Sequence, residues 1–400
     1  MSDQTRLETQ AAGVEGWLEP RLRLGPVLQA AMHVRVPMAA RTYYFGGIAL
    51  FLFGVQVVTG TLLALYYKPT PDAAYESVKF ITSDVSFGWL IRSIHHWGAN
   101  LMIVFVVLHL LRVFFQAAYK FPREITWVVG VGLLGLTLAF GFTGYLLPWD
   151  QKAYWATVVG TEIGGSVPLV GESLLLLLRG GADVTEATLA RFFGIHVLAL
   201  PLMIAGLLAI HLVLVHQLGL AHPRRPEPRP GRGSAAAANV LREGAAVSAG
   251  SGGAAGPDVG AGSGGPAGRA RPKATGDDER LRPFWPHYLL DELIAWYVLL
   301  AILVVMASMF PAGLEEEANA LETPAHIKPE WYFLGVYELL KHVPRIVGIL
   351  LPIVGIGLLT IWPFLDRNPE VLARRRILAV LGATVVLAAG IGLTIWGYLS

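Results

Sequence analysis

The sequence predicts an all-α integral membrane protein with about seven transmembrane helices. Three observations support this fold class: 54% of the 400 residues are hydrophobic, only 15% are charged, and seven apolar runs are long enough to cross a bilayer. A helix needs about 20 residues to cross the hydrocarbon core. Backbone groups in lipid must be paired within the chain, so these runs are expected to be helical. The predicted spans are 43–67, 97–119, 127–147, 192–215, 289–310, 346–364 and 377–399.

Charges in the short loops predict how these spans are oriented. Lysine and arginine collect on the cytoplasmic side of membrane proteins. They occur before the first span, between the second and third, after the fourth and between the last two, as in Lys120, Arg123 and 374–376. The loops around 72–84 and 315–317 are acidic instead. The N-terminus is therefore expected inside and the C-terminus outside. The leucine run 174–178 is too short to span and is expected at the membrane interface or in a reentrant loop.

A change of composition divides the chain into three parts. Between 231 and 276 the residues are mostly Gly, Ala, Ser and Pro, which cannot bury enough apolar surface to offset the entropy of ordering. We expect a four-helix domain over 1–221, a flexible cytoplasmic linker over 222–282 and a three-helix domain over 283–400. The chain contains no cysteine, so it cannot itself hold a disulfide, an iron–sulfur cluster on thiolates or a thioether-linked haem.

Four intramembrane histidines have a matched spacing. His95 and His109 lie fourteen residues apart in the second span, and His196 and His211 lie fifteen apart in the fourth. At about 100° and 1.5 Å per residue, each pair returns to nearly the same helix face about 21 Å further along. Both spans are predicted to run from outside to inside. His95 therefore matches His196 in depth, and His109 matches His211, which indicates two haems with two axial imidazoles each.

Intramembrane histidines also serve in helix packing and in proton relays, and either role would be the default for one histidine alone. A zinc or copper site would need its ligands clustered rather than spread over about 20 Å of helix. His96 points about 100° away from His95 and is expected to be an interfacial neighbour rather than a ligand.

Glycines and arginines accompany the histidines. Two glycine pairs repeat the fourteen-residue spacing on the first and third spans, where they would let a flat macrocycle approach the backbone, or the helices pack closely. These are Gly46 with Gly60, and Gly130 with Gly144. Three arginines lie near the histidines and could pair with haem propionates, or be ordinary interfacial residues. They are Arg92, Arg112 and Arg191.

These features, with two further motifs, resemble the cytochrome b subunit of cytochrome bc and bf complexes. The motifs are PEWY at 329–332 and GYLLPWDQ at 144–151. The resemblance covers nearly all of the chain from Arg41 onward, except the linker. The fifteen-residue spacing, PREITW at 122–127 and the seven spans resemble the bf type, here with its two chains joined. That type carries a c-type haem on a cysteine near the first span, where this chain has Tyr44, so no covalent c-type haem is expected.

The resemblance implies a subunit of a proton-translocating quinol–cytochrome c reductase in the bacterial cytoplasmic membrane. Quinol would be oxidised outside, with one electron going to a Rieske iron–sulfur protein. The other would cross through two non-covalent b-type haems to quinone inside, in a Q cycle. A c-type cytochrome and membrane lipid would be further partners, the complex would be a homodimer, and no nucleic acid is involved. The residues that would contact quinol are Pro329, Glu330, Trp331 and Tyr332, with Glu330 and Tyr332 catalytic. His216 and Glu292, or its neighbour Asp291, would lie at the inner quinone site.

Two rival functions are also compatible with intramembrane histidines. A di-haem membrane anchor of a quinone-linked dehydrogenase also uses paired histidines, but it needs no PEWY loop. A transporter could use the histidines as proton relays. Haem spectra distinguish the transporter from the other two.

Overall fold

The computed structural model describes residues 35–37, 44–219, 281–324 and 327–400, which belong to two compact units. The described part of the smaller unit is 35–37 with 281–294. In it, β1 (Arg35–Pro37) pairs antiparallel with β2 (Leu281–Pro283), and the π-helical turn η3 (Phe284–Tyr288) follows. The larger unit contains 44–219 and 295–400. Most of the predicted linker lies outside the described residues, while its last two residues belong to β2.

Seven helices in the described part of the chain are long and apolar enough to cross a membrane, which confirms the predicted all-α class and the seven spans. The two three-residue strands are the exception to an otherwise helical fold. The spans are α3 (Tyr44–Ala64), α5 (Gly88–Phe115), α6 (Glu124–Leu146), the continuous segment Glu186–Leu218, Trp285–Met309 with α12 (Leu289–Met309), α14 (Arg345–Leu365) and α15 (Ile377–Leu399).

The fourth span contains a π-helical turn at one of the histidines. It runs through α9 (Glu186–Gly194), η2 (Ile195–Ala199) and α10 (Leu200–Leu218), and η2 includes His196. Pro201 has no N–H for the carbonyl four residues earlier, which favours a departure from α geometry here. A π turn takes up one more residue than an α turn. The fifteen-residue spacing on this span therefore covers about the rise of the fourteen-residue spacing on α5.

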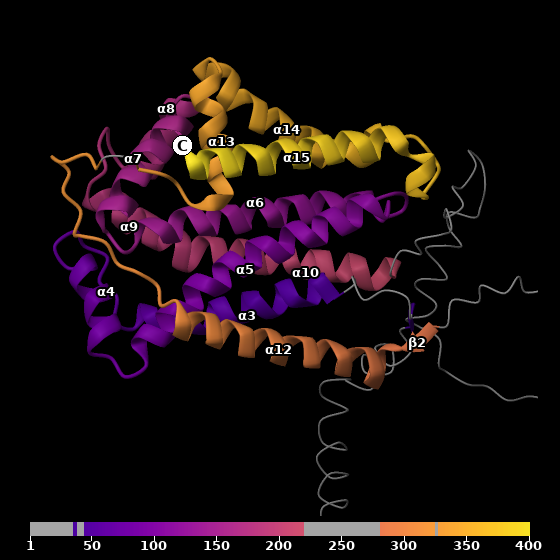
Figure 1. Cartoon of the computed structure of the whole chain (residues 1–400), viewed down its shortest axis with the longest axis horizontal. Helices are drawn as coiled ribbons and strands as arrows, with labels where there is room; N and C mark the ends of the chain where they lie inside the picture. The colour runs from indigo at the N-terminus through magenta and orange to yellow at the C-terminus, as the bar shows by residue number, and fades with distance from the viewer. Residues whose placement is uncertain (1–34, 38–43, 220–280, 325–326) are drawn as a thin grey trace, which may run out of the picture. The chain divides into compact units, whose positions relative to one another are not determined.

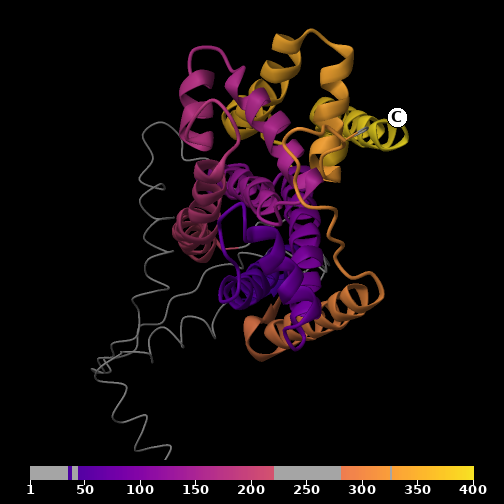
Figure 2. The same ribbon diagram turned by 90° about the vertical axis from the view of Figure 1, so that its left-hand side faces the viewer.

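The first four spans of the larger unit pack side by side. Contacts join α3 to α5, α5 to α6, and α6 to α10 (Figure 1). Seen along the helices, these four form one group, and α14 and α15 lie to one side of it (Figure 2). A core cluster fills the space between α3, α5, α10 and the later part of α12; its buried members are Ile48, Leu52, Met102, Ile204, Leu299 and Leu303.

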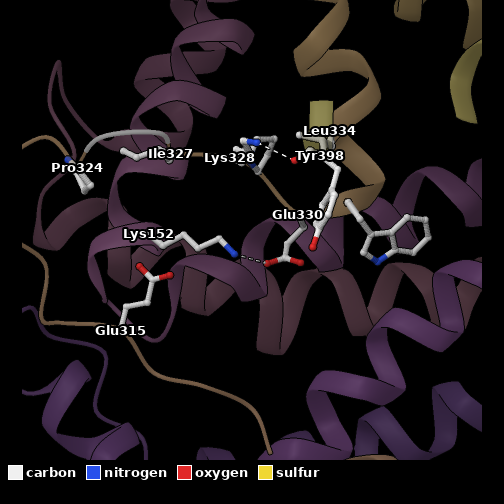
Figure 3. Close-up of a pocket in the computed structure, with 10 residues that line it drawn as sticks. Lys152, Glu315, Pro324, Ile327, Lys328, Glu330, Leu334 and Tyr398 are labelled. Carbon is white, nitrogen blue, oxygen red and sulfur yellow. Dashed lines mark hydrogen bonds and ion pairs between the residues drawn. The ribbon is translucent and has the colours of Figure 1, made fainter. Parts of the chain in front are cut away.

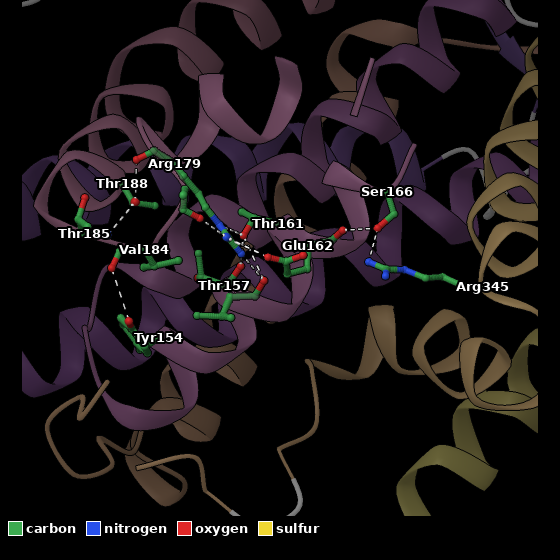
Figure 4. A network of polar contacts seen from close by, with 12 residues as sticks. Tyr154, Thr157, Thr161, Glu162, Ser166, Arg179, Val184, Thr185, Thr188 and Arg345 are labelled. Atoms are coloured by element: carbon green, nitrogen blue, oxygen red, sulfur yellow. Dashed lines mark hydrogen bonds and ion pairs between the residues drawn. The ribbon is translucent and has the colours of Figure 1, made fainter. Parts of the chain in front are cut away.

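Short helices gather at one end of the bundle (Figure 1). They include α4 (Ala74–Ser83), α7 (Gln151–Gly165) and α8 (Gly171–Arg179). Arg179 ties α7, α8 and the start of α9 together, with its side chain 4% exposed. It donates to Thr161 Oγ1 at 2.7 Å and to carbonyl oxygens of Val158 and Ala182, while Thr188 Oγ1 donates to its carbonyl (Figure 4). The leucine run 174–178 lies on α8.

A buried polar cluster joins the two halves of the chain at the other end. The Tyr119 hydroxyl donates to Asp366 at 2.5 Å and accepts from Trp362 Nε1 and from Arg376. Lys120 Nζ lies 3.0 Å from the same carboxylate. Burial alone would raise the pKa of Asp366, but the hydrogen bonds from Tyr119 and Lys120 lower it overall. The α5–α6 corner is therefore fastened to the α14–α15 corner by a charged carboxylate.

Candidate functional site

The first histidine pair is His95 on α5 and His196 in η2. Their ring centres are 6.5 Å apart and their planes are inclined by 69°. An imidazole nitrogen binds a metal at about 2 Å, so two rings that share one iron would have centres about 6 to 7 Å apart. The Nδ1 atoms are already engaged, by Thr59 Oγ1 at 2.9 Å and Thr143 Oγ1 at 3.0 Å. With both Nδ1 atoms engaged by hydroxyls, the pair has the spacing that bis-imidazole ligation through Nε2 requires.

The second pair is His109 on α5 and His211 on α10. The two are close enough for their charges to interact. Neither Nδ1 atom has a side-chain hydrogen-bond partner among the described residues. Two neighbouring imidazoles in an apolar helix bundle are a suitable donor set for haem iron. Ligation by either pair remains a prediction.

Each of the four glycines that share the histidine spacing lies against one of the four imidazoles. A Cβ added at Gly144 would lie 2.5 Å from His196 Cε1, and one at Gly60 would lie 3.1 Å from His95 Cε1. For the other pair, the distances are 3.2 Å from Gly46 to His109 and 3.4 Å from Gly130 to His211. The glycines thus make room for the imidazole rings themselves, and their clearance for a macrocycle stays a prediction.

Two of the three predicted arginines contact backbone carbonyls. Arg92 Nη1 and Nη2 donate to Ala312 O at 2.7 Å and Gly313 O at 2.6 Å. Arg191 Nη1 donates to the carbonyls of Leu176 and Leu177 at the end of α8. These bonds fasten loops, and each guanidinium keeps further donors. The propionate role of Arg92, Arg112 and Arg191 stays a prediction.

Three PEWY residues, Pro329, Glu330 and Trp331, border a cavity of about 420 Å³ at the start of α13 (Trp331–His342), whereas Tyr332 is not part of its lining. Such a volume is within the range of small-molecule sites, and the lining mixes apolar and charged groups. Lys152 and Glu330 point toward one another across it, with Glu315 on the far side of Lys152 (Figure 3). The lining residues are Lys152, Glu315, Pro324, Ile327, Lys328, Pro329, Glu330, Trp331, Leu334 and Tyr398.

Glu330 has a cationic partner in this cavity. Lys152 Nζ lies 3.2 Å from Glu330 Oε1, and the Glu330 side chain is 18% exposed. The Tyr145 ring, 5.5 Å from Lys152 Nζ, adds an aromatic face to the pair. The carboxylate is thus partly buried and paired, rather than an isolated group on an exposed loop.

The two aromatic residues after Glu330 anchor the segment on the first half of the chain. Trp331 Nε1 donates to Asn100 Oδ1 on α5 at 2.7 Å. The Tyr332 ring packs on α6, where a Cβ at Gly141 would lie 2.9 Å from its hydroxyl oxygen. Burial, and then the nearby Glu330 carboxylate, raise the pKa of Tyr332, so the phenol stays protonated as a hydrogen-bond donor.

Several residues of this cavity were missed in the sequence. Lys152 follows the GYLLPWDQ motif directly, which was the available signal for it. Glu315 belongs to the acidic loop, and burial, followed by Asp150, raises the pKa of its carboxyl. Tyr398 lies at the end of α15, and its carbonyl accepts from Lys328 Nζ at 3.0 Å. No local pattern connects Tyr398 with PEWY.

The two residues predicted for the inner quinone site belong to different compact units. His216 is exposed near the end of α10. Glu292 is 8% exposed in the first turn of α12. Each has a place near a helix end, and their pairing stays a prediction.

Seven apolar spans with two interhelical histidine pairs are typical of a membrane-spanning b-type cytochrome. The family model described as Cytochrome b/b6/petB matches residues 32–219, and that described as Cytochrome b(C-terminal)/b6/petD matches 317–400. The chain belongs to the cytochrome b/b6 family. It is therefore a subunit of a quinol-oxidising complex of the bc or b6f type, with a role in electron transfer, and the family binds b-type haems.

Individual relatives match either nearly the whole chain or about half of it. A cytochrome bc complex cytochrome b subunit of Chlorobaculum thiosulfatiphilum is 36% identical over 95% of this chain and 79% of its own length. Cytochrome b6 of Heliobacterium mobile is 47% identical over 52% of this chain and 99% of its own. A solved structure, the hyperthermophilic respiratory Complex III, matches with a TM-score of 0.76 and 32% identity, over 96% of this chain and 91% of that one.

Proposed function

We propose that this chain oxidises quinol in the PEWY cavity as part of a proton-translocating quinol–cytochrome c reductase. The observation that carries the proposal is the Glu330 carboxylate in the cavity wall, paired with Lys152 at 3.2 Å. Oxidation of a quinol releases two electrons and two protons, so the site needs a proton acceptor within reach of a quinol hydroxyl. Glu330 is that acceptor.

The surrounding residues orient the quinol and limit water. Pro329 restrains the backbone before Glu330, while Trp331 and Tyr332 hold the start of α13 against α5 and α6. The protonated Tyr332 hydroxyl is a donor suited to a quinone oxygen, and Lys152 Nζ contacts the Glu330 carboxylate at 3.2 Å and helps to orient it. Glu330 and Tyr332 are thus the catalytic residues of the proposal.

Two non-covalent b-type haems complete the proposed site, one held by His95 and His196 and one by His109 and His211. When bound, they supply one-electron transfer between the two faces of the membrane. The proposed cycle is a Q cycle, in which one electron from quinol leaves to a Rieske iron–sulfur protein and the other reaches a quinone at the opposite face. The chain would sit in a bacterial cytoplasmic membrane with its N-terminus inside, in a homodimeric complex with a c-type cytochrome.

Isolation of the complex from native membranes tests this function. We expect a Rieske protein and a c-type cytochrome to copurify with the chain, together with two b-type haem signals and quinol-dependent reduction of an added c-type cytochrome. A preparation with the haem signals but with dehydrogenase subunits in place of the Rieske protein would instead support the membrane-anchor function.

His216 and Glu292 are proposed to serve quinone reduction at the inner face. A histidine and a carboxyl can deliver protons in turn to a reduced quinone. In the isolated complex, His216→Leu should slow reoxidation of the b haems by about 10²-fold or more without loss of haem, the usual contribution of a positioned acid or base. The control is His287→Leu, because His287 is an exposed histidine in the η3 turn and has no proposed role in quinone reduction. Unchanged reoxidation in His216→Leu would refute this role.

A further inference from the structure

The two Nδ1 contacts of the first histidine pair come from equivalent positions on two different helices. Thr59 precedes Gly60 on α3 and lies 2.9 Å from His95 Nδ1, while Thr143 precedes Gly144 on α6 and lies 3.0 Å from His196 Nδ1. We propose that Thr59 and Thr143 are positioning residues that fix the Nδ1–H tautomer of both histidines and lower the reduction potential of the haem bound there. The inference rests on the proposed haem ligation by this pair.

The single proton of each hydroxyl decides the direction of these hydrogen bonds. Thr59 Oγ1 donates to Val55 O at 2.7 Å, and Thr143 Oγ1 donates to Ala139 O at 2.8 Å, both one turn earlier on their own helix. A hydroxyl has one hydrogen and two acceptor lone pairs. Once the hydrogen is directed to the carbonyl, the oxygen can only accept from the histidine. The proton of each imidazole therefore lies on Nδ1, and the lone pair of each Nε2 is free for iron.

The location of these threonines makes the arrangement stable. Thr59 is 7% exposed and Thr143 is 4% exposed, within helices that span the membrane. A buried imidazole N–H without an acceptor would lose the free energy of a hydrogen bond in a place where water does not substitute. The alternative tautomer would leave Nδ1 facing a hydroxyl whose proton is already donated. The Nδ1–H form is therefore strongly preferred at both histidines.

The second pair has no equivalent side-chain hydroxyl, although the backbone of Thr126 is a hydrogen-bond partner of the His211 ring. The residues that precede its glycines are Phe45 before Gly46 and Val129 before Gly130, which have no side-chain hydrogen-bonding group. Neither His109 Nδ1 nor His211 Nδ1 has a side-chain partner among the described residues. The chain thus gives hydroxyl acceptors to one histidine pair and withholds them from the other.

This asymmetry has an electronic consequence. An acceptor on the far nitrogen of a ligating imidazole raises the basicity of the metal-bound nitrogen and fixes the orientation of the ring. A more basic ligand stabilises the ferric state over the ferrous state, so the two hydroxyl acceptors should lower the potential of the haem held by His95 and His196.

Redox titration of the isolated complex tests the inference, with the two haems followed by their optical bands. Thr59→Val and Thr143→Val should each shift the potential of the His95–His196 haem upward, and the double variant should shift it further. The potential of the His109–His211 haem should stay unchanged. Thr59→Ser and Thr143→Ser, which keep the hydroxyl, should stay close to wild type.

Two threonines without a histidine contact are matched controls. Thr137 on α6 is 3% exposed and donates to Leu133 O, and Thr61 on α3 is exposed and donates to Val57 O. Equal upward shifts in Thr137→Val or Thr61→Val, or equal shifts of both haems, would overturn the inference. If a valine variant loses the haem, retention in the serine variant supports the hydroxyl role, and loss in the serine variant as well overturns it. Absence of both haems in the wild-type complex would instead refute the proposed function.

Discussion

Replacement of His196 by leucine is expected to remove one b-type haem from the complex and leave the other in place. The His95 and His196 rings face one another at 6.5 Å, so a variant at either position loses one of the two axial ligands of the same iron. His95→Leu should therefore remove the same haem as His196→Leu. His109→Leu and His211→Leu should remove the other. Pyridine haemochrome assay should show half of the wild-type b haem in each variant.

Glycine variants also test whether the histidine pairs hold the haems, without removing a ligand. Gly144→Ala would place a Cβ 2.5 Å from His196 Cε1, closer than atoms tolerate, so the imidazole must move away from its partner. The effect should decrease in the order Gly144, Gly60, Gly46 and Gly130, as the Cβ–imidazole distances lengthen from 2.5 to 3.4 Å. Gly54→Ala is the control, because nothing lies within 4 Å of its Cβ.

Loss of the same haem in the His95 and His211 variants would show that the proposed pairing of the histidines is wrong.

Glu330→Gln is expected to slow quinol oxidation by about 10²-fold or more, the usual contribution of a positioned general base. Glutamine keeps the shape of the side chain but cannot accept a proton from quinol. It also removes the charge that Lys152 Nζ contacts at 3.2 Å. Both haems should remain bound, because Glu330 lies outside the histidine pairs. Steady-state quinol–cytochrome c reductase activity, with haem content measured on the same sample, checks this result.

Glu322→Gln provides the control for the same loop. Glu322 is exposed and is not part of the cavity lining, so its change should leave turnover at the wild-type rate. Lys152→Met separates proton acceptance from charge pairing, since it keeps the carboxylate and removes only its partner. Full turnover of Glu330→Gln at all pH values would exclude Glu330 as the proton acceptor.

Local sequence patterns were sufficient to predict the spans and to single out the four histidines. Hydrophobic run length predicted all seven helices because a bilayer imposes one length on every span. The periodicity of the α-helix likewise placed His95 and His109 on one face of α5. The four glycines that contact the four histidines were found by the same spacing. Only the structure showed that each glycine lies directly against an imidazole.

The cavity could not be predicted from local patterns, because distant parts of the chain form its lining. Lys152 and Glu330 are 178 positions apart, and Tyr398 reaches the same cavity from the last helix. Which residues oppose PEWY depends on how α13 packs on α6 and α15, and this packing has no signature in a single sequence. The buried cluster of Tyr119, Asp366 and Arg376 was missed for the same reason.

The sequence by itself determined the all-α membrane class, the number of spans and the spacing of the histidines, because these depend on composition and on helix periodicity. The tertiary structure decided how those residues are used. The π turn at His196 compensates the fifteen-residue spacing, since Pro201 cannot continue the α-helical hydrogen bonding. The tautomers of His95 and His196 follow from hydroxyls on two other helices, and only packing in three dimensions brings a hydroxyl within 3.0 Å of an imidazole 36 or 53 residues away.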